Sequence, residues 1–304
     1  MATANGNIDL GQRAMLSHLA LSAWTPGRND KAGRDIIVAA QGSSPAYHKA
    51  VKCLIDPGVL CDVTAAQGKV RAAHYRYTLP WLDNGARILP VALLMRYEDE
   101  VGAARREFEA AVSDFVWVKY PAAMRRAEYE QGAAYDPAAY PSQESLARKF
   151  ASKVTYLPIP QADDFRVDLD GPTVAAIKSQ CQDDMMTAAR TVTQNCIVRI
   201  QDVVGKMVEG LSAYNGDDRV TGKRGPQKGD FKGTLVTNIA DLIDVLPGLN
   251  ITDDATVRDA INAMRELVRA DHTALKADPT LRKDVRNEAQ AILDRMAGYM
   301  GEAA

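Results

Sequence analysis

The stretch from Val174 to Leu211 constrains the fold more than any other part of the chain, because apolar residues recur along it at helical spacing without a break. Ten steps cover 37 residues, a mean of about 3.7, which is helical and closer to an eleven-residue repeat than to a strict heptad. We therefore predict one helix of about forty residues, long enough for a bundle backbone or a coiled-coil arm. Its apolar positions are Val174, Ile177, Cys181, Met185, Ala188, Val192, Cys196, Ile200, Val203, Met207 and Leu211.

A helix with one apolar stripe is stable in water only when another surface covers the stripe. We predict that it docks against a second copy of the chain or against a partner protein. The residues expected to make this assembly contact are Ile177, Met185, Val192, Ile200, Met207 and Leu211. Cys181 and Cys196 lie on the same stripe and are expected to be buried thiols.

The rest of the chain predicts a mixture of short strands and further helices. Asn84-Gly85 is a strong signal for a two-residue hairpin turn. The expected strands are 34–40, those flanking the hairpin turn, 153–160 and 164–169; the other expected helices are 45–55, 91–119, the "ESLARKFA" segment, 234–246, 252–268 and 279–299. Tyr120-Pro121 is expected to end or kink the helix before it, and Pro247-Gly248 is expected to end another. We predict an α+β, predominantly α-helical protein, with a hairpin-containing N-terminal region at 1–170 and a long-helix C-terminal bundle at 171–304.

The segment "RVTGKRGPQKGDFKGT" directly follows the long helix and carries five cations, one anion and four glycines. Its cations could hold several phosphates, and its phenylalanine could stack on a base, as in proteins that bind single strands. The residues of this candidate nucleic-acid site are Arg219, Lys223, Arg224, Lys228, Phe231 and Lys232. Two other interpretations stay open, a solvated surface loop between helices and a contact with an acidic protein.

Composition and motifs argue against several classes of protein. Hydrophobic residues make up 46% of the chain and charged residues 25%, and the net charge is −2, so any nucleic-acid contact must be local. No stretch approaches the roughly 20 apolar residues of a membrane-spanning helix. Four cysteines without a C-x-x-C pair predict reduced thiols and a cytoplasmic location. Walker A, G-x-G-x-x-G and G-x-S-x-G motifs are absent from the sequence, and its histidines lack ligand spacing, so we expect no cofactor, no metal and no enzymatic activity.

Several phrases resemble a family of phage and bacterial proteins named domain of unknown function 3150. They are "GTLVTNIADLIDVLPGLNITDDATVRDAI", "DPTLRKDVRNEAQAILDRMAGYM", "RYEDEVGAARREFEAAVSDFV" and "YPSQESLARKF". The resemblance covers residues 70–300. It implies a phage-type origin and a partner role beside a MoxR-type ATPase and a von Willebrand-type protein, and it carries over no catalytic residue.

Three hypotheses follow. The first is a non-enzymatic protein that assembles with itself or with a protein partner through the long helix. The second is a protein that binds or anneals single-stranded nucleic acid through the basic segment at 219–232. The third is a metal-dependent enzyme that uses scattered carboxylates.

Overall fold

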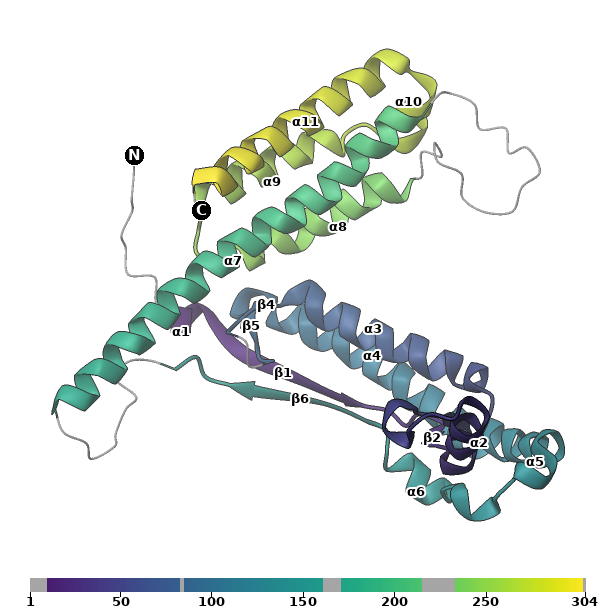
Figure 1. Cartoon of the computed structure of the whole chain (residues 1–304). Helices are drawn as coiled ribbons and strands as arrows, with labels where there is room; N and C mark the ends of the chain where they lie inside the picture. The colour runs from purple at the N-terminus through teal and green to yellow at the C-terminus, as the bar shows by residue number, and fades with distance from the viewer. Residues whose placement is uncertain (1–9, 83–84, 161–170, 215–232, 303–304) are drawn as a thin grey trace. The chain divides into compact units, whose positions relative to one another are not determined.

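The described part of the chain folds mainly into helices, with a small four-stranded sheet and a separate two-stranded ribbon (Figure 1). The computed structural model describes residues 10–82, 85–160, 171–214 and 233–302. It is 73% helical, and four strands form an antiparallel sheet, which confirms the predicted α+β, predominantly helical class.

The chain divides into two compact units. Unit 1 comprises residues 1–18, 76–95 and 156–304, and unit 2 comprises residues 19–75 and 96–155. Unit 1 therefore takes residues from both sides of position 170, where the sequence analysis placed a boundary.

The long helix of unit 1, α7, runs without interruption over Gly171–Ala213, 43 residues, as its spacing predicts. It packs most extensively on α11 (Pro279–Glu302) and α8 (Thr234–Leu249), and less on α9 (Ala255–Leu267). Figure 1 shows these helices beside the C-terminal part of α7, with the short α10 (His272–Ala277) leading into α11. The predicted C-terminal bundle is therefore present, with α7 as its longest member.

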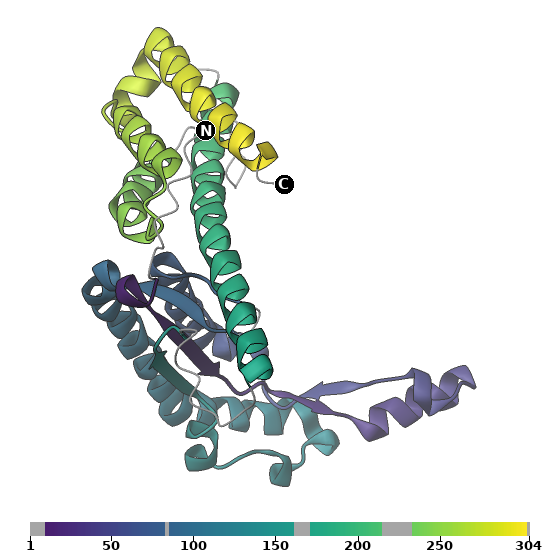
Figure 2. The ribbon, with the colours of Figure 1, turned by 90° about the vertical axis from the view of Figure 1, so that its left-hand side faces the viewer.

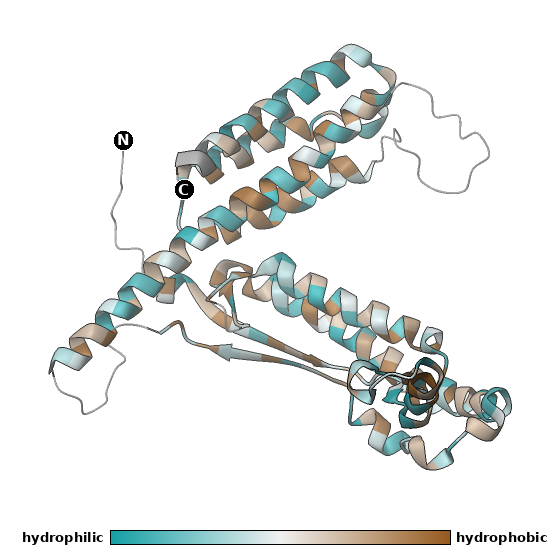
Figure 3. Ribbon diagram, viewed as in Figure 1, coloured by the Kyte–Doolittle hydropathy of each residue, from teal (hydrophilic) through white to brown (hydrophobic). Residues whose placement is uncertain are grey.

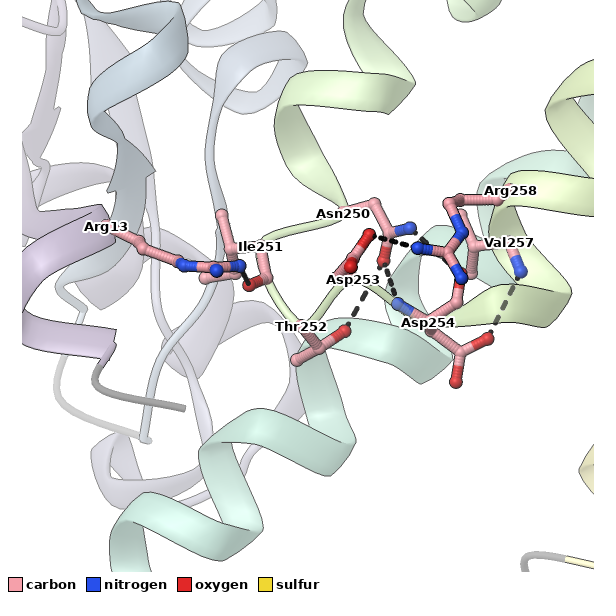
Figure 4. Close-up of polar contacts among 8 residues, drawn as sticks. All are labelled: Arg13, Asn250, Ile251, Thr252, Asp253, Asp254, Val257 and Arg258. Atoms are coloured by element: carbon pink, nitrogen blue, oxygen red, sulfur yellow. Dashed lines mark hydrogen bonds and ion pairs between the residues drawn. The ribbon is translucent and has the colours of Figure 1, made fainter. Parts of the chain in front are cut away.

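The turn between α8 and α9 is held by its own side chains (Figure 4). The amide oxygen of Asn250 accepts from the backbone N–H of Asp254 at 3.0 Å, and its amide nitrogen donates to the Asp254 carbonyl at 3.0 Å. Asp253 has φ 52°, in the left-handed region that aspartate tolerates better than most residues. Arg13 donates to the Ile251 carbonyl at 3.1 Å and so joins the short helix α1 (Leu10–Arg13) to this turn.

The sheet has the strand order β4-β5-β1-β6. Its strands are β4 (Leu79–Pro80), β5 (Arg87–Pro90), β1 (Ala14–Ser22) and β6 (Ala151–Leu157). β4 and β5 pair antiparallel, with Leu79 opposite Ile88 and Pro80 opposite Arg87, so the predicted pairing of these two strands is confirmed, while Asn84 of the predicted two-residue turn lies outside the described residues. The predicted strand at 164–169 lies outside the described residues.

Unit 2 is built around aromatic side chains on a nearly continuous helical path. α4 (Leu94–Asp114) passes through one π-helical turn (Phe115–Lys119) into α5 (Tyr120–Gln131). The Phe115 ring lies 6.3 Å from the Trp24 ring, 6.0 Å from Tyr120 and 5.8 Å from Phe150, between ring centroids. α3 (Cys61–Tyr77) and α6 (Gln143–Ala147) contribute further apolar residues to this core.

One arm of unit 2 differs from the prediction. The segment 34–40, expected to be a buried strand, belongs to helix α2 (Lys31–Gln41), which begins where the Asp30 carboxylate accepts from the Gly33 N–H at 2.9 Å. The expected helix at 45–55 is instead a 3₁₀ turn (Pro45–Tyr47) and strand β3 (Val51–Cys53), which pairs with β2 (Gly27–Asn29). Figure 2 shows α2 at the end of this two-stranded ribbon. No side chain from Gly27 to Cys53 is buried, so apolarity alone misled the prediction of a buried strand.

The two prolines expected to end helices also lie inside helical paths. Pro121 directly follows the π-helical turn in the continuous path from α4 to α5, and the Val116 carbonyl of that turn accepts from the Gln143 side chain at 3.0 Å. Pro247 lies in the last turn of α8, which continues to Leu249.

Candidate functional site

The side chains of α7 separate the helix into two parts with different environments. From Pro172 to Thr187, here called the outer half, no side chain is buried. From Ala188 to Ala213, the inner half, a regular set of side chains is buried against the neighbouring helices. Figure 2 shows the first turns of α7 extending past the other helices of its bundle.

The inner half is core. Val192, Ile200 and Met207 are each 0% exposed, and Leu211 is also buried. Ile197 and Val204 are buried with them, whereas Val203, which the sequence stripe includes, is only half-buried. Figure 3 shows apolar residues (brown) along α8 and the adjoining part of α7. Four of the six predicted assembly residues therefore contact helices of their own chain.

A half-buried arginine joins the inner half to the hairpin side of unit 1. Arg199 donates to the Thr78 carbonyl at 2.6 Å and to the Arg76 carbonyl at 2.9 Å. Its Nε donates to the Asn195 side chain at 3.0 Å. Burial lowers the pKa of Arg199 below its ordinary value. Sequence reasoning missed this contact, because an arginine beside an apolar stripe is usually solvent-exposed.

The thiol of Cys196 lies in the same core. Its Sγ is 3.8 Å from the Leu249 carbonyl, and burial raises its pKa to about 12. A thiol that stays protonated at neutral pH is a poor nucleophile and metal ligand. The prediction of a buried thiol is confirmed for Cys196, while Cys181 on the outer half is only half-buried.

The outer half has a narrow, partly covered face that we call the α7 stripe. Every position from Pro172 to Thr187 outside the stripe is exposed, including Met186 at 53%. Its members are the half-buried Val174, Ile177, Lys178, Cys181, Asp184 and Met185, and the buried Ala188, where the inner half begins. Ile177 and Met185 are thus the two predicted assembly residues that belong to the outer half, and both are half-buried.

The predicted nucleic-acid residues, Arg219 to Lys232, lie outside the described residues.

Unit 2 contains a separate cavity of about 400 Å³, lined by residues that include Trp24, Arg28, Tyr140 and Lys149. Arg28 and Lys149 are the charged members of its lining, which contains no histidine and no carboxylate. The lining therefore offers no conventional acid–base pair.

Within the described residues, no three histidine, cysteine, aspartate or glutamate side chains are grouped as metal ligands. In the same part of the chain, every helix is too short or too polar to cross a lipid bilayer.

Comparison with protein-family models, with curated proteins and with solved structures finds no match to this chain.

Proposed function

We propose that this protein is a non-enzymatic assembly protein that associates with other copies of itself, or with a partner protein, through the outer half of α7. One observation carries the proposal: a single continuous helix has its inner half in the core and its outer half without one buried side chain. Most of the stability of a helix in a protein comes from packing of an apolar face and not from the propensity of its residues. The outer half carries such a face in Val174, Ile177 and Met185, which favours a partner for it.

The resemblance suggests the biological setting of this proposal. A phage-type protein in the cytoplasm, working beside a MoxR-type ATPase, would use such a surface to build or join a larger complex. The arm at 27–53 offers a second exposed surface, with Ile36 at 69% and Tyr47 at 86% exposure. Binding of single-stranded nucleic acid through residues 219–232 remains the alternative.

Sedimentation of the purified protein over a range of concentrations tests the proposal. The wild type should associate, and Ile177→Asp should weaken that association because it places a charge on the α7 stripe. Met186→Asp is the matched control, since it adds the same charge to the same helix away from the stripe. The proposal would be refuted if the wild-type protein stays monomeric on its own and also does not associate when it is mixed with the MoxR-type ATPase. Salt-sensitive binding of an oligonucleotide by that monomer would favour the alternative.

A further inference from the structure

Two cations without counter-ions line the cavity of unit 2. Arg28 lies on β2 and Lys149 follows α6, and within the described residues neither side chain forms an ion pair or a hydrogen bond. The lining contains no carboxylate. A third cation, Lys52, lies directly opposite Arg28 in the ribbon, and like charges in such a pair repel. An anion from outside the chain would relieve this repulsion.

The acceptors of the lining, in contrast, already have donors. The Leu54 carbonyl accepts from the Tyr140 hydroxyl at 2.6 Å and from the Gln131 amide at 2.9 Å. The Pro141 carbonyl accepts from the Tyr120 hydroxyl at 2.9 Å. The side chains of the lining that stay free to bind a ligand are therefore donors, and donors bind anions.

Aromatic rings form a fixed wall of the same cavity. The Trp24 ring centroid lies 6.3 Å from that of Phe115 and 5.9 Å from that of Tyr120, which meets it edge-on. The second aromatic member of the lining, Tyr140, has its ring 5.0 Å from that of Tyr135. Because neighbouring rings hold this wall in place, a flat ligand ring packs against it without ordering loose side chains first.

The charge and the size of the cavity define the ligand class. A phosphate monoester carries close to two negative charges at neutral pH, which matches two cations, and arginine binds its oxygens in bidentate geometry. The volume of about 400 Å³ is in the range of small-molecule sites. We infer that this cavity binds a nucleoside monophosphate, with its phosphate held by Arg28 and Lys149 and its base packed against Trp24. The inference concerns unit 2 and is independent of the proposed function.

Isothermal titration calorimetry of the full chain with adenosine monophosphate tests the inference. This nucleotide should bind with a Kd on the order of 10–100 µM, and adenosine or inorganic phosphate alone should bind at least about tenfold more weakly. Binding should weaken between pH 7 and pH 5, because the phosphate takes up a proton with a pKa of about 6. Inorganic phosphate that binds as tightly as the nucleotide, or the absence of heat with the nucleotide, would overturn the inference.

Matched variants locate the site. Lys149→Gln and Arg28→Gln should each weaken nucleotide binding about tenfold, because each removes a charge-assisted contact to the phosphate. Both side chains are exposed, so the fold should persist, which circular dichroism checks. Arg148→Gln is the control, since it removes an exposed cation next to Lys149 that lies outside the lining, and it should leave the Kd unchanged. Equal weakening in the control would show a general charge effect and overturn the site.

A 5′-phosphorylated oligonucleotide distinguishes a free nucleotide from the end of a strand. Weaker binding than that of adenosine monophosphate supports a free nucleotide as the ligand. Tighter binding that Lys149→Gln abolishes would support the site and identify its ligand as a strand end.

Discussion

Two isoleucines of α7, Ile200 and Ile177, allow the division of the helix to be tested with the same substitution. Ile200→Ala removes three carbon groups from a side chain that is 0% exposed. At about 0.8 kcal/mol for each buried group, the transfer term is about 2.4 kcal/mol, and the cavity left behind brings the expected loss in unfolding free energy to about 2–5 kcal/mol. Ile177 is half-buried and lies outside the core, so the same change should cost about 1 kcal/mol or less in the monomer.

Urea unfolding followed by far-ultraviolet circular dichroism measures both variants. The loss in Ile200→Ala should be the same at low and high protein concentration, because the contacts are within one chain. The effect of Ile177→Ala should grow with concentration, since association stabilises the folded state by mass action. Equal losses for the two variants in dilute protein would refute the division of α7 into a core half and a docking half.

Three further predictions concern the fold around the site. A Cβ on Gly248 would lie 2.6 Å from Leu93 side-chain atoms, so Gly248→Ala should lower the melting temperature, and a stabilised variant would contradict the close packing. Gly205→Ala is the control: its Cβ would have no atom within 4 Å, so it should raise the free energy of unfolding by about 0.5–1 kcal/mol. Asn250→Ala removes the two bonds to Asp254 and the weaker one from Thr252 in the turn of Figure 4, and it should cost about 1–3 kcal/mol in chemical unfolding. A neutral result would show that the turn holds without these bonds. Burial raises the pKa of Tyr120 from 10.0 to about 12, so the unfolded state loses this proton first and the free energy of unfolding should fall from pH 10 towards 12. Tyr120→Phe should flatten that part of the pH–stability profile. An unchanged profile would count against Tyr120 as the group responsible.

The long helix and the hairpin could be predicted from the sequence because each follows from a local rule. The spacing of apolar residues from Val174 to Leu211 needs only helical geometry, and Asn84-Gly85 needs only turn chemistry. The prediction for segment 34–40 was wrong because two isoleucines and a valine favour a strand locally, while the Asp30 cap and the lack of any buried side chain in the arm permit a helix.

The candidate site was predicted only in part, for a physical reason. A periodic stripe shows that one face of a helix is apolar, and it does not show whether the chain itself or another molecule covers that face. Val192, Ile200 and Met207 are fully buried in their own chain, whereas Ile177 and Met185 are only half-buried. The contact of Arg199 could not be predicted because it is made to the backbone carbonyls of Arg76 and Thr78. Every residue has a backbone carbonyl, so the sequence gives no sign of which ones an arginine will meet.

Hydrogen exchange along α7 at two protein concentrations tests the central claim most directly. Amides of Ala188–Ala213 should be protected at every concentration, because this half lies in the core of its own chain. Amides of Ala175–Thr187 should exchange quickly in dilute protein and become protected when the concentration is raised. Uniform protection of the whole helix in dilute protein, or an outer half that exchanges equally fast at both concentrations, would contradict the account.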